Sequence, residues 1–203
     1  MDDSATSARS GASDATRKPY GQLMSPQRLT LRCQKGELPR EIAELIGSWA
    51  TPTEDALMWE HRVGGPVPAD LVLARAADQG VIPFTLHADA AGDENPLAYG
   101  ELWVDDDETE VEVARLIVDP RFRSRGIGAR LARELGTRAQ AHHPDVFLRV
   151  RPDNAAARRC YEKAGYRRVD PESEQQWNIG QPLPYAWYRY SPPDGDQADH
   201  FST

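Results

Sequence analysis

The sequence lacks the features that would tie it to a membrane, a metal or an oxidising compartment. Its only two cysteines, Cys33 and Cys160, form no metal-ligand spacing and predict reduced thiols. No apolar run approaches the length of a membrane span, and the N-terminus has no apolar signal core. We therefore expect a cytoplasmic protein with no metal and no membrane partner.

Two common phosphate-binding motifs are also absent. There is no Gly-Lys-Ser or Gly-Lys-Thr, which excludes a nucleotide P-loop, and residues 126–131 lack the third small residue of the dinucleotide fingerprint. The formal net charge of −8 argues against nucleic-acid binding and fits a cationic partner.

The length and composition predict one ordinary domain. The chain has 203 residues, of which 39% are hydrophobic and 28% charged. Residues 1–25 are rich in small and polar residues and show no periodicity, so we expect them to be disordered. The domain should then span residues 26–190, with a tail over 191–203.

Residues 111–131 organise the rest of the chain. Both alternating sets of side chains in 111–118 are apolar, which predicts a central strand that is covered on both faces. Asp119 and Pro120 end the strand, because proline contributes no N–H to a ladder. After Gly126 the apolar residues recur at every fourth position and predict a helix: Ile127, Leu131, Leu135 and Ala139.

The turn between this strand and this helix has the composition of an anion site. Its two glycines, Gly126 and Gly128, let the backbone come close to a ligand where the helix opens with unpaired N–H groups. Positive charge comes from Arg121, Arg123 and Arg125. The alternative is an ordinary glycine turn among solvated arginines.

The turn resembles the hallmark of the GNAT superfamily of acyl-CoA-dependent N-acyltransferases. That hallmark is Arg/Gln-x-x-Gly-x-Gly/Ala after a central strand, and residues 123–128 match every fixed position. The resemblance continues through 146–151, Asn154 and 161–166, and it covers about residues 28–190. It implies an α/β GNAT fold, in which helices flank a mixed, mostly antiparallel central sheet with a splayed pair of parallel strands.

Patterning places the remaining elements along the chain. Strands are expected at 28–33, 81–88, 97–104, 111–118, 146–150, 166–169 and 185–190, and helices at 38–49, 53–61, 69–78 and 154–164. The first four strands should be antiparallel, whereas the crossover from 111–118 to 146–150 should be parallel and right-handed. A polar excursion separates the last two strands.

The resemblance implies acetyl-CoA as co-substrate and no metal. The positions that match the family's cofactor contacts are Leu116, Ile117, Val118, Arg123, Ser124, Arg125, Gly126, Ile127, Gly128, Ala129, Asn154, Ala157 and Tyr161. Val118 would act through its backbone, since main-chain groups at the family's strand bulge pair with the pantetheine arm. Asn154 shares a helix face with Tyr161, and it also suits a plain helix cap.

Transfer of an acyl group from a thioester to an amine needs a base for the amine and an acid for the departing thiolate. The resemblance implies Tyr161 as the acid, the alternative being an aromatic residue in the core. It implies Glu112 as the base, with Glu110 and Glu101 as alternatives and a solvated carboxylate as the plainer interpretation. Cys160 has no histidine or carboxylate motif around it, so direct attack is favoured over an acyl-enzyme.

We therefore expect an N-acetyltransferase that moves the acetyl group of acetyl-CoA to a primary amine, either a small molecule or a peptide. The alternatives are a protein N-terminal or lysine acetyltransferase and a non-catalytic acyl-CoA sensor. The acidic cluster over 105–112 indicates a cationic acceptor or merely a solvated face. Residues 35–80, where the family builds its acceptor wall, match no subgroup, and a homodimer and the acyl-chain preference are left open.

Overall fold

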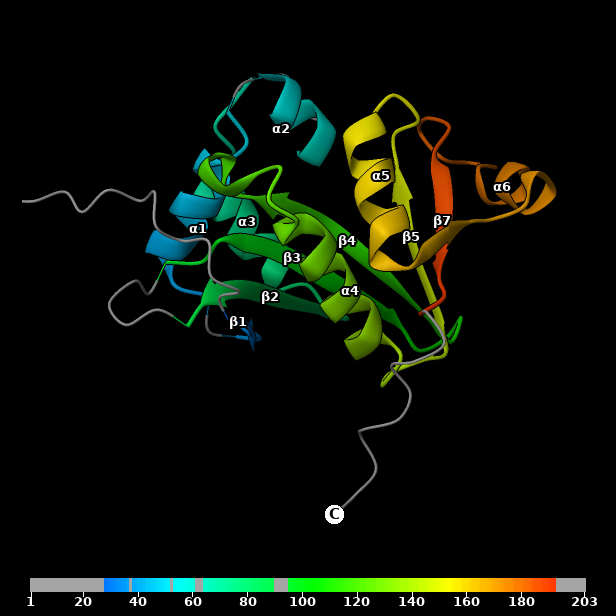
Figure 1. The fold of residues 1–203 in the computed structure, drawn as a ribbon, viewed down its shortest axis with the longest axis horizontal. Coiled ribbons are helices and arrows are strands. Elements are labelled where there is room, and N and C mark those ends of the chain that lie inside the picture. Colours follow the sequence, from blue (N-terminus) through cyan, green and yellow to red (C-terminus); the bar gives the residue numbers. More distant parts are fainter. Residues whose placement is uncertain (1–27, 37, 52, 61–63, 90–94, 193–203) are drawn as a thin grey trace, which may run out of the picture.

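A seven-stranded β-sheet forms the centre of the molecule (Figure 1). The computed structural model describes residues 28–192, except 37, 52, 61–63 and 90–94. The predicted disordered segment 1–25 and most of the predicted tail lie outside these residues. The strands are β1 (Leu29–Cys33), β2 (Val81–Ala88), β3 (Ala98–Asp105), β4 (Glu110–Val118), β5 (Asp145–Val150), β6 (Tyr166–Arg168) and β7 (Ala186–Tyr190).

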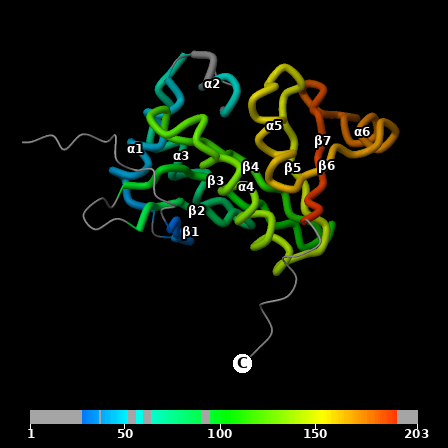
Figure 2. Tube along the Cα trace, viewed as in Figure 1, coloured from blue at the N-terminus to red at the C-terminus, as the bar shows by residue number. Residues whose placement is uncertain are grey.

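Helices cover both faces of this sheet. They are α1 (Arg40–Ser48), α2 (Thr53–Glu60), α3 (Ala69–Ala76), α4 (Ile127–Ala139), α5 (Ala155–Ala164) and α6 (Pro171–Trp177), with a short 3-10 helix η2 (Pro120–Phe122). The trace in Figure 2 places α1, α2 and α3 at one side of the molecule and α5, α6 and β7 at the other. None of the described helices is long and apolar enough to cross a membrane.

The strand order β1-β2-β3-β4-β5-β7-β6 confirms the predicted α/β fold with a mostly antiparallel sheet. β1 to β4 form consecutive antiparallel pairs, and β4 pairs with β5 in parallel. This parallel pairing covers only Glu110 to Glu112 opposite Asp145 to Phe147, although β4 continues to Val118. The two strands therefore separate after Glu112, as the family resemblance implied.

The bulge in β4 lies earlier than predicted. Tyr99 faces Ile117 and Glu101 faces Ala114, so β4 carries one more residue than β3 between these pairs. Arg115 occupies this stretch with φ of 55°, a left-handed conformation that non-glycine residues seldom adopt. The expected bulge at Val118 is therefore wrong, since Val118 pairs regularly with Ala98. No pattern in the local sequence predicted a left-handed backbone conformation at Arg115.

The distorted backbone at Arg115 is held by a tryptophan of α2. Trp59 Nε1 donates a hydrogen bond to the Arg115 carbonyl oxygen at 2.7 Å, and Arg115 Nη1 donates one to the Trp59 carbonyl oxygen at 2.7 Å. These two hydrogen bonds hold the end of α2 against the bulge and stabilise the unusual backbone conformation of Arg115.

Two apolar clusters pack against opposite faces of the sheet. One joins α4 and α5 to the strands and includes the fully buried Leu131 and Leu135, so truncation of either leucine to alanine should cost about 2–5 kcal/mol. The other joins α1, α2 and α3 to Tyr99 and Ile117. The apolar stripe predicted after Gly126 is thus confirmed as the buried face of α4.

The helix α6 was missed, because it lies in the segment predicted to be a polar excursion. Its start carries a recognisable cap: Asp170 accepts a hydrogen bond from the Ser173 amide at 2.9 Å, and Pro171 occupies the first turn. The helix itself is short and polar, without an apolar stripe, so periodicity could not reveal it.

Candidate active site

A cleft of about 660 Å³ opens where β4 and β5 separate. It brings together most of the predicted site residues, namely Glu112, Leu116, Ile117, Val118, Arg123, Ser124, Gly126, Gly128, Ala129, Asn154, Ala157 and Tyr161. Two other predicted residues do not line it. The Arg125 guanidinium lies over the Phe122 ring at 5.6 Å, and Ile127 packs against the core.

One end of the cleft is formed by the turn before α4. Gly126 is the N-cap residue of this helix and has φ of 82°, which favours glycine. No side chain caps the helix, and its first turn holds no acidic residue. A Cβ added at Gly126 would meet nothing within 4 Å, so the space beside the turn is open. The N–H groups of the first turn are therefore available to an anion.

The second glycine of the turn serves packing rather than backbone conformation. A Cβ added at Gly128 would lie 3.0 Å from Cys160 Sγ and 3.5 Å from Val118 Cγ2. Gly128 thus allows α4 to approach α5 and β4 closely. The two glycines of the motif have different physical roles, which spacing alone could not distinguish.

The arginines of the turn bind protein groups. Arg123 donates from Nε to the Val118 carbonyl oxygen and from Nη2 to the Trp49 carbonyl oxygen, each at 3.0 Å. Arg121 forms an ion pair with the buried Asp119, with Nε 3.0 Å from Oδ2. The predicted positive charge is present, and part of its role is to hold the turn against the sheet.

The backbone of Val118 faces the opened side of β4. The Asp119 amide donates to the Leu97 carbonyl oxygen at 3.0 Å across the β3–β4 ladder. Because backbone groups of consecutive strand residues point to opposite sides, those of Val118 point away from β3. They are directed to where β5 has separated, so the Val118 amide can donate to an extended ligand there, while the Val118 carbonyl oxygen already accepts one hydrogen bond from Arg123 Nε.

The helix α5 contributes a capping asparagine and a partly buried phenol to the cleft. Asn154 Oδ1 accepts a hydrogen bond from the Ala157 amide at 3.0 Å, so its expected capping role is present while the residue also lines the cleft. Burial raises the pKa of Tyr161, and its neighbour Cys160 adds to this effect, so the phenol keeps its proton at neutral pH.

Burial also raises the pKa of the Cys160 thiol, an effect that the nearby Lys163 only partly offsets. A thiol in this state is a poor nucleophile at neutral pH. The environment of Cys160 therefore agrees with the expectation that the chemistry does not pass through an acyl-enzyme.

Glu112 lies on β4 at the point where the parallel strands begin to separate. Arg149 Nε is 3.1 Å from Glu112 Oε1, and the Glu112 side chain is 20% exposed. Burial raises the pKa of Glu112 to about 7, although Arg149 and then Arg115 act in the opposite direction. The carboxyl group therefore exchanges its proton near neutral pH, as a general base should.

The two alternative bases are placed less favourably. Glu101 is 1% exposed, and its two oxygens accept hydrogen bonds from Tyr99 Oη and Trp103 Nε1, each at 2.7 Å. Glu110 is exposed at the start of β4. Of the three carboxylates, Glu112 alone lines the cleft.

Sequence reasoning missed Arg149, which connects four residues at this end of the cleft. Besides its contact with Glu112, it donates from Nη1 to Gln181 Oε1 at 3.0 Å. Its guanidinium lies 5.2 Å from the Tyr185 ring centroid and 5.5 Å from that of Trp187. These partners are far from Arg149 in the sequence, so no local pattern could have indicated the cluster.

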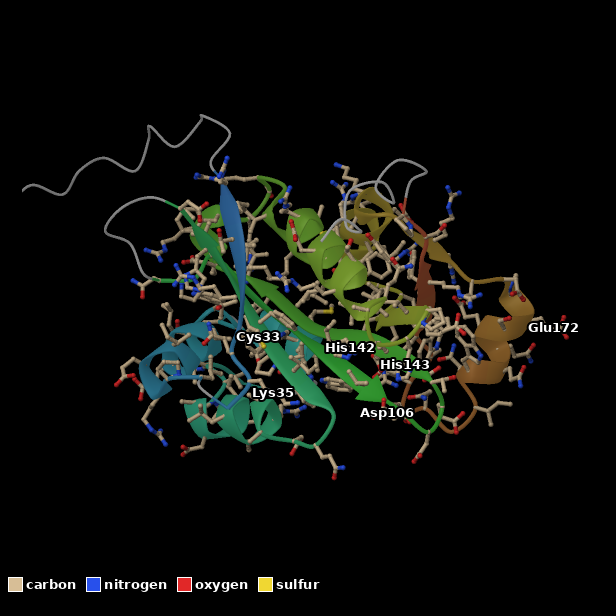
Figure 3. The ribbon with its side chains drawn as sticks, turned by 90° about the horizontal axis from the view of Figure 1, so that it is seen from below. Cys33, Lys35, Asp106, His142, His143 and Glu172 are labelled. Carbon is tan, nitrogen blue, oxygen red and sulfur yellow. The ribbon has the colours of Figure 1, made fainter. Side chains whose placement is uncertain are left out.

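The acidic cluster of the sequence does not form a wall of the cleft. Asp105 accepts hydrogen bonds from the amides of Asp107 and Glu108, and it shapes the exposed turn between β3 and β4. Asp106 pairs with His143 at 2.9 Å, beside the end of the sheet (Figure 3). Glu112 is the one member that reaches the cleft, so the cluster is no indication of a cationic acceptor.

Comparison with known proteins identifies related chains and folds. A profile described as "Acetyltransferase (GNAT) family" matches residues 47–166. The N-alpha-acetyltransferase RimI of Mycobacterium tuberculosis is 47% identical over 60 residues, which are 30% of this chain and 37% of that protein. The chain therefore matches little more than a third of the length of this curated relative.

Solved structures with the same fold share much less sequence. Aminoglycoside acetyltransferase AAC(6')-Ib, in complex with coenzyme A and kanamycin, has a TM-score of 0.56 and 19% identity, over 81% of this chain and 95% of that chain. The ribosomal-protein-S18-alanine N-acetyltransferase of Escherichia coli has a TM-score of 0.51 and 19% identity, over 70% and 80%. At these identities the likeness establishes the fold alone.

Proposed function

Because the chain belongs to the acetyltransferase (GNAT) family, we propose that it transfers the acetyl group of acetyl-CoA to a primary amine by direct attack. One observation carries this proposal. The cleft joins the uncapped start of α4, the outward-facing backbone at Val118 and the carboxyl group of Glu112 in one continuous space. The activity is assigned to the domain predicted over residues 26–190, most of which the structure describes.

The residues of the cleft fit acetyl-CoA. The N–H groups at the start of α4 would bind the pyrophosphate, since the open space beside Gly126 lets an anion approach the backbone. The backbone of Val118 would pair with the pantetheine arm. Asn154 and Tyr161 line the cleft from α5, where they would contact the arm and the thioester sulfur.

The chemistry needs two proton transfers, and the cleft offers one group for each. Glu112 would accept a proton from the amine, whose nitrogen forms the new bond to the acetyl carbon as the carbon–sulfur bond breaks. Tyr161 would donate its proton to the departing thiolate. Burial supports both assignments, because it makes Glu112 more basic and keeps Tyr161 protonated.

Acetylation of a protein N-terminus is a second candidate. It is supported by the 47% identity to RimI over 60 residues, in a protein named as an N-alpha-acetyltransferase. A cleft that is open enough to admit an extended peptide would serve this reaction.

The test is a panel of small amines and short peptides, each incubated with acetyl-CoA while thiol release is followed. We expect release that depends on the amine and that falls strongly in Tyr161→Phe and Glu112→Gln. Tight binding of acetyl-CoA without turnover on any amine or peptide would instead indicate an acyl-CoA sensor.

A further inference from the structure

The cleft has an end that lies away from the phosphate turn, and we call its lining residues the acceptor end: Trp59, Trp103, Glu112, Arg115, Arg149 and Tyr185. β4 links this end to the turn, and its six steps from Glu112 to Val118 span about 20 Å. If acetyl-CoA occupies the turn and the outward-facing edge of β4, as proposed above, the amine must approach from the acceptor end.

The charge at the acceptor end is positive. Glu112 is the one carboxylate among the described residues that line the cleft, and Arg149 Nε is 3.1 Å from it. Arg115 adds a second guanidinium, held by the Trp59 carbonyl oxygen at 2.7 Å and lying 5.6 Å from the Trp103 ring centroid. A first ammonium group would meet Glu112. A second ammonium group would find no further carboxylate among the described lining residues, and it would lie near two arginines.

The remaining surface of the acceptor end is largely aromatic. Trp59 packs edge-on against Tyr99 at 6.4 Å, which fixes its ring. Trp103 is held through its Nε1 hydrogen bond to Glu101, and Tyr185 lies beneath the Arg149 guanidinium. These three rings come from α2, β3 and the segment before β7, and all three line the same cleft as Glu112.

We propose that the acceptor is a monoamine on an aromatic or similarly apolar body, and that polycationic amines are rejected. Arg115 is the main specificity-determining residue, because its charge opposes a second ammonium group while its side chain is fixed by Trp59 and Trp103. The negative net charge of the whole chain does not contradict this, since the acidic residues of the β3–β4 turn lie outside the cleft. This inference rests on the proposed acetyl transfer.

The experiment compares kcat/KM for 2-phenylethylamine, spermidine and kanamycin with acetyl-CoA, read as thiol release. We expect 2-phenylethylamine to exceed both polycations by at least about tenfold. Arg115→Gln should narrow that ratio by about tenfold, whereas Arg115→Lys, which keeps the charge, should preserve it. Thermal unfolding of both variants confirms that they fold.

Arg189→Gln is the matched control. Arg189 pairs with Asp145 and, like Arg115, has its guanidinium over an aromatic ring, with Cζ 5.4 Å from the Phe147 ring centroid, yet it is not among the residues that line the cleft. Its loss should leave the ratio between the amines unchanged.

Three results separate the possibilities. A preference for 2-phenylethylamine that narrows in Arg115→Gln alone supports the inference. Equal or faster turnover of spermidine or kanamycin, or a ratio that Arg115→Gln leaves unchanged, overturns it while acetyl transfer stands. The absence of turnover on every amine overturns both the inference and the proposed function.

Discussion

The kcat/KM of the reaction should rise with pH near neutrality, and replacement of Glu112 by glutamine should abolish this rise. Burial raises the pKa of this carboxyl group to about 7 against the opposing effects of Arg149 and Arg115. Only the ionised form can accept a proton, so about a tenth of the protein is competent at pH 6 and about nine tenths at pH 8. Wild-type kcat/KM should therefore rise as the pH rises through about 7.

Glu112→Gln should lose this step and depend on amine that is already deprotonated in solution. A positioned base contributes about 10²–10⁴-fold, so the loss should be of that order at pH 7 and much smaller near pH 10, where free amine is abundant. Initial rates of thiol release between pH 6 and pH 10 measure both profiles. Glu110→Gln is the control, because Glu110 lies two residues away on β4 and is not among the lining residues. It should keep the step and move it to lower pH, since Glu110 is one of the groups that raise the pKa of Glu112. A uniform loss across this range would remove Glu112 from the mechanism.

The same pKa has a consequence for stability that does not depend on catalysis. A carboxyl group whose folded pKa is about 7, against a usual value of 4.5, holds its proton more tightly in the folded state. Its contribution to stability is complete below pH 4.5 and declines by about 3 kcal/mol as the pH rises to 7. The free energy of unfolding is measured by urea denaturation for Glu112→Gln and for the wild type. The value for the variant should increase relative to that of the wild type as the pH rises from 4.5 to 7. If the free energies of unfolding of the two proteins changed with pH in parallel, the assigned pKa would be wrong.

Three further substitutions test neighbouring parts of the cleft. Arg149→Met should shift the alkaline rise of kcat/KM to higher pH, because Arg149 is the main group that lowers the pKa of Glu112, while Arg189→Met should leave the profile in place. Gly126→Asp should bind coenzyme A about tenfold or more weakly than Gly126→Asn, as measured by calorimetry. Both side chains tolerate the left-handed backbone, but only the aspartate carries a negative charge that repels phosphate. Tyr161→Phe should lower kcat by roughly 10–10³-fold with little change in coenzyme A affinity, and full activity would return the phenol to a packing role.

The local framework of the site could be predicted from the sequence. The strand over 111–118, the glycine turn and the helix after Gly126 each follow from short-range patterns, namely apolar alternation, a positive-φ residue and a repeat at every fourth position. The Asn154 cap is equally local, since its side chain binds an amide three residues ahead. Interactions within one turn or one strand depend on neighbouring residues alone, which is why these predictions hold.

The parts that sequence patterns could not supply depend on contacts between distant segments. The β4 bulge at Arg115 is stabilised by Trp59, and Arg149 meets Glu112, Gln181 and Tyr185 only when the sheet has formed. The run of acidic residues over 105–112 left two interpretations open for the same reason, because only the tertiary structure shows that Glu112 is the one member that lines the cleft. The sequence identifies the charged residues, but only the tertiary structure shows which of them line the cleft.

The central claim is direct acetyl transfer within the cleft, and mass spectrometry of a single turnover tests it most directly. Protein is mixed with a slight deficit of acetyl-CoA and an excess of each acceptor of the amine and peptide panel in turn, and the masses of the acceptor, the coenzyme and the intact protein are measured at successive times. Direct transfer predicts acetylated amine and free coenzyme A in equal amounts, with no acetylated protein at any time. An acetyl group on Cys160 that appears before the product, or acetyl-CoA that remains intact with every acceptor offered, would contradict the account.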